Sequence, residues 1–318
     1  MATVSMASSL PTNLTSFKSR RSNRSSSGVA FASLSQDTVK ITEGAGNLPK
    51  VVLTSTHGSE AEIYLFGGCV TSWKVPSGKD LLFVRPDAVF NGKKPISGGI
   101  PHCFPQFGPG AIQQHGFARN MNWSVLDSET IEGNPVVTLE LKDDAYSRSM
   151  WDFSFQALYK VILNSKSLST VLTVTNTDTK AFSFNTTLHT YFSASVTGAS
   201  VKGLLGCKTL NKDPDPKNPL EGKEEREVVS FPGFVDCVYL NASNELQLDN
   251  GLGDVISIKN AKYVADSLVC WTDAVLWNPH LTMEACYKDF VCVENAKIGD
   301  VQLQPDQSWV AEQHLSIA

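Results

Sequence analysis

FSFQALYKVIL (153–163), LSTVLTVTN (168–176) and FSFNTTL (182–188) are the segments that decide the fold class. In each segment apolar and polar residues alternate, and Val, Ile, Thr, Tyr and Phe fill many of the positions. A period of two with β-branched and aromatic residues predicts strands that bury one face. Only a few turn residues separate the segments, so the sequence predicts three strands joined by short connections.

The same pattern continues on both sides of these segments. EAEIYLF (60–66) and VVTLEL (136–141) also alternate, and glycine-rich turns such as GG (67–68) and NGLG (250–253) separate such runs. Long stretches with a helical period of 3.6 are nearly absent. Many short strands with turn signals predict an all-β fold, either a large sandwich or a barrel.

The overall composition limits the classes of function. The chain has 318 residues, 42% of them hydrophobic and 19% charged, which is typical of a globular protein. A net charge of −5 argues against non-specific nucleic-acid binding, because that would need a clustered basic surface. No run of 18 apolar residues occurs, so the sequence predicts no transmembrane helix.

The N-terminal 36 residues differ from the rest of the chain. They contain no acidic residue, but they include one lysine, three arginines and eleven serines. This composition predicts a disordered plastid transit peptide over residues 1–36, cleaved between Ala30 and Thr38. It places the mature domain at residues 37–318 and the protein in the chloroplast stroma. A basic tail of a cytosolic protein is the alternative.

The seven cysteines form no C-x-x-C pair. Neither a zinc site nor a secreted disulfide framework is therefore predicted. We expect most of them to be small buried hydrophobic residues in a reducing compartment. A redox-regulated pair, with Cys286 and Cys292 as the nearest neighbours in sequence, remains open.

Reactive side chains gather in three segments, residues 97–120, 188–192 and 289–295. The first is part of a long polar stretch dense in Gly, Pro, Gln and His, and binding groups often lie on such loops of a β scaffold. Among their side chains are two imidazoles, one guanidinium and one carboxylate in polar loops or at strand ends, at His115, His189, Arg119 and Glu294. These groups could form an acid–base site.

Four sequence blocks resemble a known family. GGIPHCFPQFG (98–108), QQHGFARN (113–120), LHTYF (188–192) and VCVEN (291–295) are similar to signature blocks of the glucose-6-phosphate 1-epimerases, in the aldose 1-epimerase superfamily. The resemblance extends from about Ile41 to the C-terminus. It implies a large antiparallel β-sandwich of the galactose mutarotase type, with the site on a concave face. It also implies an isomerase that interconverts the anomers of a phosphorylated hexose.

The resemblance also implies roles for particular residues. Mutarotation needs one proton delivered to the ring oxygen and one removed from the anomeric hydroxyl, so one acid and one base suffice without metal or cofactor. The matching blocks imply His189 as the general acid and Glu294 as the general base. The substrate-binding positions implied are Gln114, His115, Arg119 and Asn211.

Without the family resemblance, these residues could also have purely structural roles. A histidine between apolar neighbours, such as His189, is often a hydrogen-bonded core residue. A carboxylate near a strand end, such as Glu294, is often a solvated edge residue. His115 could serve only to order its loop.

Two positions depart from the family pattern. The family has arginine, a phosphate ligand, where this chain has Ser97, and aspartate where it has Asn211. Arg119 matches the other phosphate ligand, and its planar fork suits that role. The departures leave two alternatives: a free aldose as substrate, or a non-catalytic subunit of a thylakoid NAD(P)H dehydrogenase-like complex.

Overall fold

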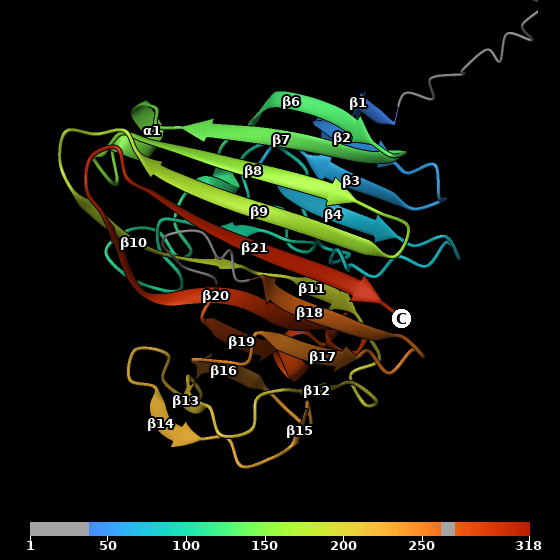
Figure 1. The fold of residues 1–318 in the computed structure, drawn as a ribbon. Coiled ribbons are helices and arrows are strands. Elements are labelled where there is room, and N and C mark those ends of the chain that lie inside the picture. Colours follow the sequence, from blue (N-terminus) through green and yellow to red (C-terminus); the bar gives the residue numbers. More distant parts are fainter. Residues whose placement is uncertain (1–37, 262–270) are drawn as a thin grey trace, which may run out of the picture. The chain divides into compact units, whose positions relative to one another are not determined.

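The computed structural model describes residues 38–261 and 271–318. The predicted transit peptide, residues 1–36, and Cys270 lie outside the described residues. Three antiparallel sheets contain the strands (Figure 1). The smallest sheet has the order β1-β2-β3-β4, with β1 (Val39–Glu43), β2 (Pro49–Thr54), β3 (Glu60–Tyr64) and β4 (Cys69–Lys74).

The largest sheet has nine strands in the order β15-β12-β17-β18-β21-β9-β8-β7-β6. Its first five strands are β15 (Val228–Ser230), β12 (Ser200–Lys202), β17 (Glu245–Asp249), β18 (Val255–Ala261) and β21 (Ser308–Ile317). The other four are β9 (Ser167–Asn176), β8 (Phe155–Leu163), β7 (Asn134–Lys142) and β6 (Ser124–Ile131). In Figure 1 the long strands β7, β8, β9 and β21 lie side by side.

The third sheet has eight strands in the order β14-β13-β16-β19-β20-β10-β5, with β11 also paired to β20. Its first four strands are β14 (Leu220–Lys223), β13 (Lys208–Asn211), β16 (Val235–Leu240) and β19 (Asp273–Asn278). The others are β20 (Phe290–Leu303), β10 (Phe182–Leu188), β5 (His102–Cys103) and β11 (Tyr191–Ser193).

The all-β prediction is confirmed, and the three opening segments match β8, β9 and β10. In β8 every second residue is buried, as the alternation predicts. The strands β8 and β9 belong to the nine-stranded sheet, whereas β10 belongs to the eight-stranded sheet. The chain therefore changes sheet after β9, and this crossing builds the sandwich.

Helices are short and lie in the connections. The elements are α1 (Ala145–Arg148), η1 (Ala45–Asn47), η2 (Ala118–Asn120), η3 (His280–Met283) and η4 (Tyr287–Asp289). None of the helices among the described residues has the length and apolar character needed to cross a membrane.

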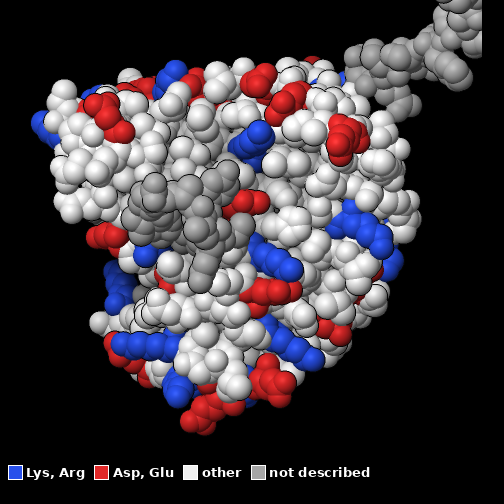
Figure 2. Space-filling model, in the orientation of Figure 1, with Lys and Arg blue, Asp and Glu red and all other residues white. Residues whose placement is uncertain are grey.

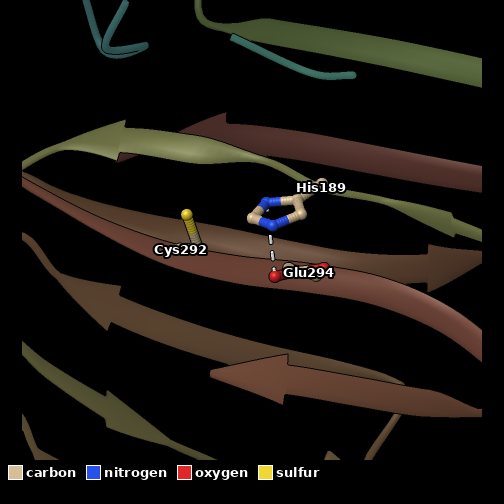
Figure 3. A group of neighbouring side chains, drawn as sticks. All are labelled: His189, Cys292 and Glu294. Atoms are coloured by element: carbon tan, nitrogen blue, oxygen red, sulfur yellow. Dashed lines mark ion pairs between the residues drawn. The ribbon is translucent and has the colours of Figure 1, made fainter. Parts of the chain in front are cut away.

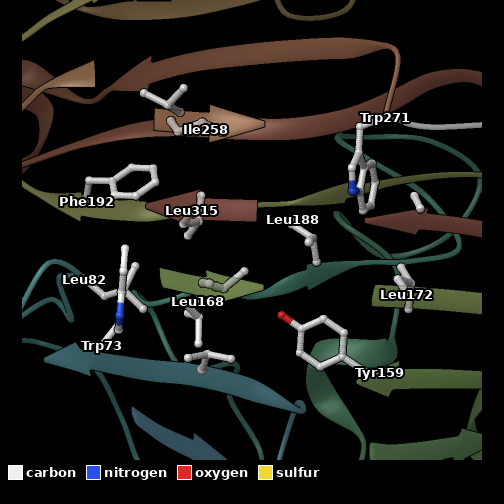
Figure 4. Close-up of a cluster of buried hydrophobic side chains, with 14 of the residues drawn as sticks. Trp73, Leu82, Tyr159, Leu168, Leu172, Leu188, Phe192, Ile258, Trp271 and Leu315 are labelled. Carbon is white, nitrogen blue, oxygen red and sulfur yellow. The ribbon is translucent and has the colours of Figure 1, made fainter. Parts of the chain in front are cut away.

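The main core contains apolar side chains from both large sheets (Figure 4). Tyr159 and Leu172 come from the nine-stranded sheet, and Leu188 comes from the eight-stranded sheet; each is at most 2% exposed. The eight-stranded sheet thus has a core face against this cluster and an outer face on the opposite side. On the face of the molecule visible in Figure 2, acidic and basic side chains are interspersed.

Candidate active site

Strand register gathers the site residues on the outer face of the eight-stranded sheet. Trp277 in β19 pairs with Asp236 in β16 and with Cys292 in β20, and Cys292 also pairs with Tyr191 in β11. Residues directly opposite each other in antiparallel strands share a face. Glu294 follows Cys292 by two positions and therefore points the same way. The outer face thus carries one row of side chains across four strands.

His189 lies directly after β10 and faces this row. Its ring stacks on Tyr191 with the centroids 4.8 Å apart and meets the edge of Trp277 at 5.6 Å. The Nδ1 atom of His189 is 3.3 Å from Oε1 of Glu294 (Figure 3). Both residues are buried, His189 with 8% and Glu294 with 2% of its surface exposed. The structure therefore brings the predicted acid and the predicted base into contact.

Buried polar atoms of this site have no hydrogen-bond partner among the described residues. His189 Nδ1 is such an atom, because its 3.3 Å contact with Glu294 Oε1 lacks hydrogen-bond geometry, and Glu294 Oε2 and Arg119 Nε are two more. Buried polar atoms in folded proteins are nearly always paired, so unpaired ones need an explanation, and a catalytic role or a bound ligand is one. The three side chains can therefore form hydrogen bonds with the polar atoms of a bound ligand.

The loop between β5 and β6 presents the second imidazole. Phe104 O accepts hydrogen bonds from the N–H groups of Phe117 and Ala118, which closes the loop. A Cβ at Gly116 would lie 2.1 Å from the same oxygen, so only glycine fits there. His115 is thereby held with its ring centroid 5.6 Å from that of His189.

The hydrogen bonding of His115 fixes its tautomer. Its Nδ1 accepts from the backbone N–H of Gly108 at 3.2 Å, so Nε2 carries the proton of the neutral ring. His115 Nε2 lies 3.4 Å from the amide nitrogen Nε2 of Gln114, and because both nitrogens then carry hydrogen they do not bond to each other. His115 therefore orders the loop and also offers a donor at the site.

Arg119 and Gln114 form one unit of this loop. Arg119 Nη2 donates to the backbone carbonyl of Gln114 at 2.9 Å, which leaves the Nε–H without a partner among the described residues. Its positive charge acts on the pKa of both His115 and His189. Of the predicted binding residues, Gln114, His115 and Arg119 therefore lie beside the His189–Glu294 pair.

The structure does not bring Asn211 to this group. Asn211 pairs with Cys237, and these positions lie on the core face, one residue out of phase with Asp236. Its side chain is exposed and accepts from the N–H of Asp213 at 3.2 Å, as in an Asx turn.

Two residues that the sequence analysis did not assign approach the site instead. Lys212 Nζ lies 3.5 Å from Asp236 Oδ1 and 4.1 Å from the centroid of the Phe107 ring. Both charges act on the pKa of Glu294. Asp236 lies in FVDCVYL (234–240), which is similar to a further sequence block of the same family, and that similarity could have indicated it. Lys212 lies in a charged stretch that reads as a solvated loop, so no sequence signal marked it.

A cavity of about 540 Å³ opens beside these residues. Its lining includes Phe107, Lys212 and Val238. Val238 pairs with Val275, and Val275 with Glu294, so this wall continues the outer face. Ligand cavities typically enclose about 300–1,000 Å³, so this cavity has room for a hexose. His189, Glu294 and Arg119 are not among the residues that line it.

Burial favours the neutral forms of both reactive groups. It lowers the pKa of His189 well below 6.5, and the positive charges of Arg119 and Lys212 lower it further. It raises the pKa of Glu294 well above 4.5, although Lys212 opposes that shift. A neutral imidazole beside a protonated carboxyl holds as many protons as an imidazolium beside a carboxylate. The pair therefore retains one exchangeable proton in either form.

A metal ion has a possible donor set here. One ligand atom each of His189, Cys292 and Glu294 lies within 4.8 Å of the others (Figure 3). These donor types suit zinc. However, the charges of Arg119 and Lys212 oppose a cation, and burial raises the pKa of the Cys292 thiol well above 9. The electrostatics of the site favour an anion over a cation.

Comparisons with known proteins agree on one family. A protein of Cenchrus ciliaris named "Putative glucose-6-phosphate 1-epimerase" is 35% identical over 281 residues, covering 82% of each chain. A protein of the same name from Escherichia coli is 28% identical over 258 residues, covering 76% of this chain and 81% of its own.

Solved structures show the same fold. A crystal structure titled as a putative mutarotase from Salmonella typhimurium aligns with a TM-score of 0.77 and 25% identity, covering 88% of this chain and 94% of its own. A galactose mutarotase-like protein from Clostridium acetobutylicum aligns with a TM-score of 0.70 and 16% identity, covering 88% and 98%.

The family model described as aldose 1-epimerase matches residues 49–316, nearly the whole of the described domain and all of the site residues above. With this match, the sandwich fold and the 35% identical relative, the chain belongs to the aldose 1-epimerase family and is an isomerase.

Proposed function

We propose that this protein interconverts the α and β anomers of hexose 6-phosphates, glucose 6-phosphate among them. The observation that carries the proposal is the buried His189–Glu294 pair, 3.3 Å apart, in which both side chains have an atom without a hydrogen-bond partner in the described part of the chain. Ring opening moves one proton onto the ring oxygen and removes another from the anomeric hydroxyl. His189 is the proposed donor, and Glu294 the proposed acceptor.

The electrostatics of the site explain how the pair reaches its working protonation state. Burial favours neutral His189 and protonated Glu294, whereas the proposed reaction needs an imidazolium and a carboxylate. Loss of the proton from Glu294 and gain of one by His189 converts the first form into the second, with the total number of protons unchanged. The negative charge of a bound phosphate stabilises the imidazolium, and Lys212 stabilises the carboxylate. Substrate binding thus favours the charged form.

The phosphate specificity rests on Arg119. Its unpartnered Nε–H and the nearby ammonium of Lys212 provide positive charge for a phosphorylated sugar. We expect Arg119→Ala to raise KM for glucose 6-phosphate by about 10–100-fold, the loss of one charged hydrogen bond, relative to its effect on free glucose. Equal effects on the two sugars would instead support the free-aldose alternative.

The direct test is anomer exchange measured by NMR. Purified protein lacking residues 1–36 is added to glucose 6-phosphate and to glucose at equilibrium, and magnetisation transfer between the anomers is followed. The proposal predicts faster exchange of glucose 6-phosphate. Exchange at the uncatalysed rate for both sugars contradicts it. The alternative of a non-catalytic thylakoid subunit then takes over, although such a subunit would have no evident need for a buried unpartnered acid–base pair.

We also propose that residues 1–36 are a plastid transit peptide and that the mature domain, residues 37–318, works in the chloroplast stroma. The acid-free, serine-rich composition supports this proposal. Sequencing the N-terminus of the protein isolated from plastids should give a start between Ala30 and Thr38. A mature protein that begins near Met1 contradicts the proposal.

A further inference from the structure

The serine at position 97 has an arginine directly opposite it. Arg85 donates its backbone N–H to Ser97 O at 2.9 Å, and Gly99 donates to Phe83 O at 2.8 Å. These bonds pair the two segments antiparallel, with Arg85 facing Ser97 and Phe83 facing Gly99. Side chains directly opposite each other share a face of the sheet. The Arg85 guanidinium therefore lies on the same side as the side chain at position 97.

That side is the outer face that carries the active site. Phe83, two residues before Arg85, stacks on Phe290 with the centroids 5.1 Å apart and packs in one cluster with Tyr191. Val84, between them, packs in a different cluster. By strand alternation Arg85 points with Phe83 toward Tyr191, whose ring stacks on that of His189.

Arg85 is arranged like an anion-binding group. Its side chain is only 16% exposed, whereas that of its partner Asp87 is 63% exposed. Nε and Nη2 of Arg85 donate to the two carboxylate oxygens of Asp87 at 2.9 and 2.6 Å. A phosphate can occupy the same bidentate fork. Because Asp87 is on the solvent side, it can turn away while the guanidinium stays in place.

The two arginines act on the same residue from different segments. Burial raises the pKa of Tyr191 well above 10, and the positive charges of Arg85 and Arg119 both oppose that rise. The charge of Arg119 also lowers the pKa of His189 itself. Tyr191, which stacks on His189, is therefore close enough to both guanidinium groups to feel their charge.

We propose that Arg85 is a specificity-determining residue that binds the phosphate group of the substrate together with Arg119. Arg85 would do so on the outer face, where the short side chain of Ser97 leaves room for its guanidinium. The proposal rests on the function proposed above, since it assigns the second phosphate ligand of that site. Asp87 holds the Arg85 fork until the substrate replaces it.

The test compares glucose 6-phosphate with glucose in four proteins. The variants are Arg85→Ser, the exchange variant Arg85→Ser/Ser97→Arg, and the matched control Arg226→Ser. Arg226 is likewise held by a carboxylate two residues away, at 2.8 Å on both nitrogens, but on a different segment. For each protein the ratio of kcat/KM for the two sugars is measured by NMR exchange, and the Kd of glucose 6-phosphate by calorimetry.

We expect Arg85→Ser to lower the ratio and weaken the Kd by about 10–100-fold, the loss of one charged bidentate contact. The exchange variant should recover most of this loss, because it returns a guanidinium to the same face, and Arg226→Ser should behave as wild type. Wild-type exchange and wild-type discrimination in Arg85→Ser overturn the inference and leave the proposed function intact. Arg85-dependent binding without any exchange overturns the function and keeps the inference. Absence of both binding and exchange in the wild type overturns both.

Discussion

At the active site, the polar side chains on the two faces of the eight-stranded sheet differ in their hydrogen bonding. On the outer face, His189 Nδ1 and Glu294 Oε2 have no hydrogen-bond partner among the described residues. On the core face, Gln313 from β21 donates to both Thr190 and Asn295, the residues that follow them in the chain. In both His189–Thr190 and Glu294–Asn295, the first residue points outward without a hydrogen-bond partner among the described residues. The second residue points inward and is hydrogen-bonded.

The inward polar groups have a structural role, whereas the outward groups are the proposed acid and base. The bridge through Gln313 crosses between the two large sheets and ties together the segments that carry the acid and the base. Because these polar groups are all at most 2% exposed, they stabilise the structure only while every partner is present. The hydrogen bonds of Thr190 and Asn295 fix the backbone next to His189 and Glu294. The side chains of His189 and Glu294 are therefore held in position without using the atoms that exchange protons.

The largest expected effect comes from the outward carboxyl. Glu294→Gln keeps the shape of the side chain but cannot accept a proton, so anomer exchange should fall by about 10²–10⁴-fold in kcat. The pKa of Glu294 is raised in the fold, so its contribution to stability is present at low pH and lost as pH rises through that pKa. Glu294→Gln should therefore equal or exceed the wild type in unfolding free energy at pH 8, measured by urea denaturation.

Glu245→Gln, at an exposed glutamate of β17, is the matched control for that substitution. It should leave both exchange and stability unchanged. If Glu294→Gln kept near-wild-type exchange, the assignment of the base would be wrong.

The second effect concerns an inward histidine. His102 in β5 is 1% exposed, stacks on Trp123 and makes an edge-to-face contact with Tyr159. Burial lowers its pKa from 6.5 to about 4. A lowered pKa contributes stability that is complete above pH 6.5 and lost as pH falls toward 4, here about 3 kcal/mol. His102→Phe should reduce the fall in unfolding free energy between these pH values by that amount. An unchanged pH dependence would contradict the neutral buried state of His102.

The third effect tests the bridge itself. Gln313→Leu leaves the polar atoms of Thr190 and Asn295 without their shared partner, at a cost of about 1–3 kcal/mol in unfolding free energy. Because the acid and base lose their support, kcat should fall while KM for glucose 6-phosphate changes less. Ser308→Ala, at an exposed position of the same strand, should change neither. A destabilised variant with wild-type kcat would limit Gln313 to a structural role.

The smallest effect is expected at Asn211. Its register places it on the core face and its side chain is exposed, so Asn211→Ala should change kcat/KM by less than about twofold. Asp236→Ala, on the outer face, should reduce it more strongly. The reverse order would return Asn211 to the set of substrate ligands.

Much of the fold could be predicted because strand formation depends on local alternation. The segments 153–163, 168–176 and 182–188 carry their own period-2 pattern, and each forms a strand close to those limits. The sequence blocks also indicated the family before any geometry was known. These features depend on neighbouring residues along the chain, which the sequence lists directly.

The composition of the site was decided by the tertiary structure. His189 and Glu294 meet only because β10 and β20 are neighbours in the sheet. Register then decides which side chains join them, since a shift of one residue moves a side chain to the opposite face. The register excludes Asn211 from the active site and places Arg85 opposite Ser97. Both outcomes depend on which strand segments pair and in which register, and the physical reason that the sequence alone could not decide them is that this pairing joins residues that are not neighbours along the chain.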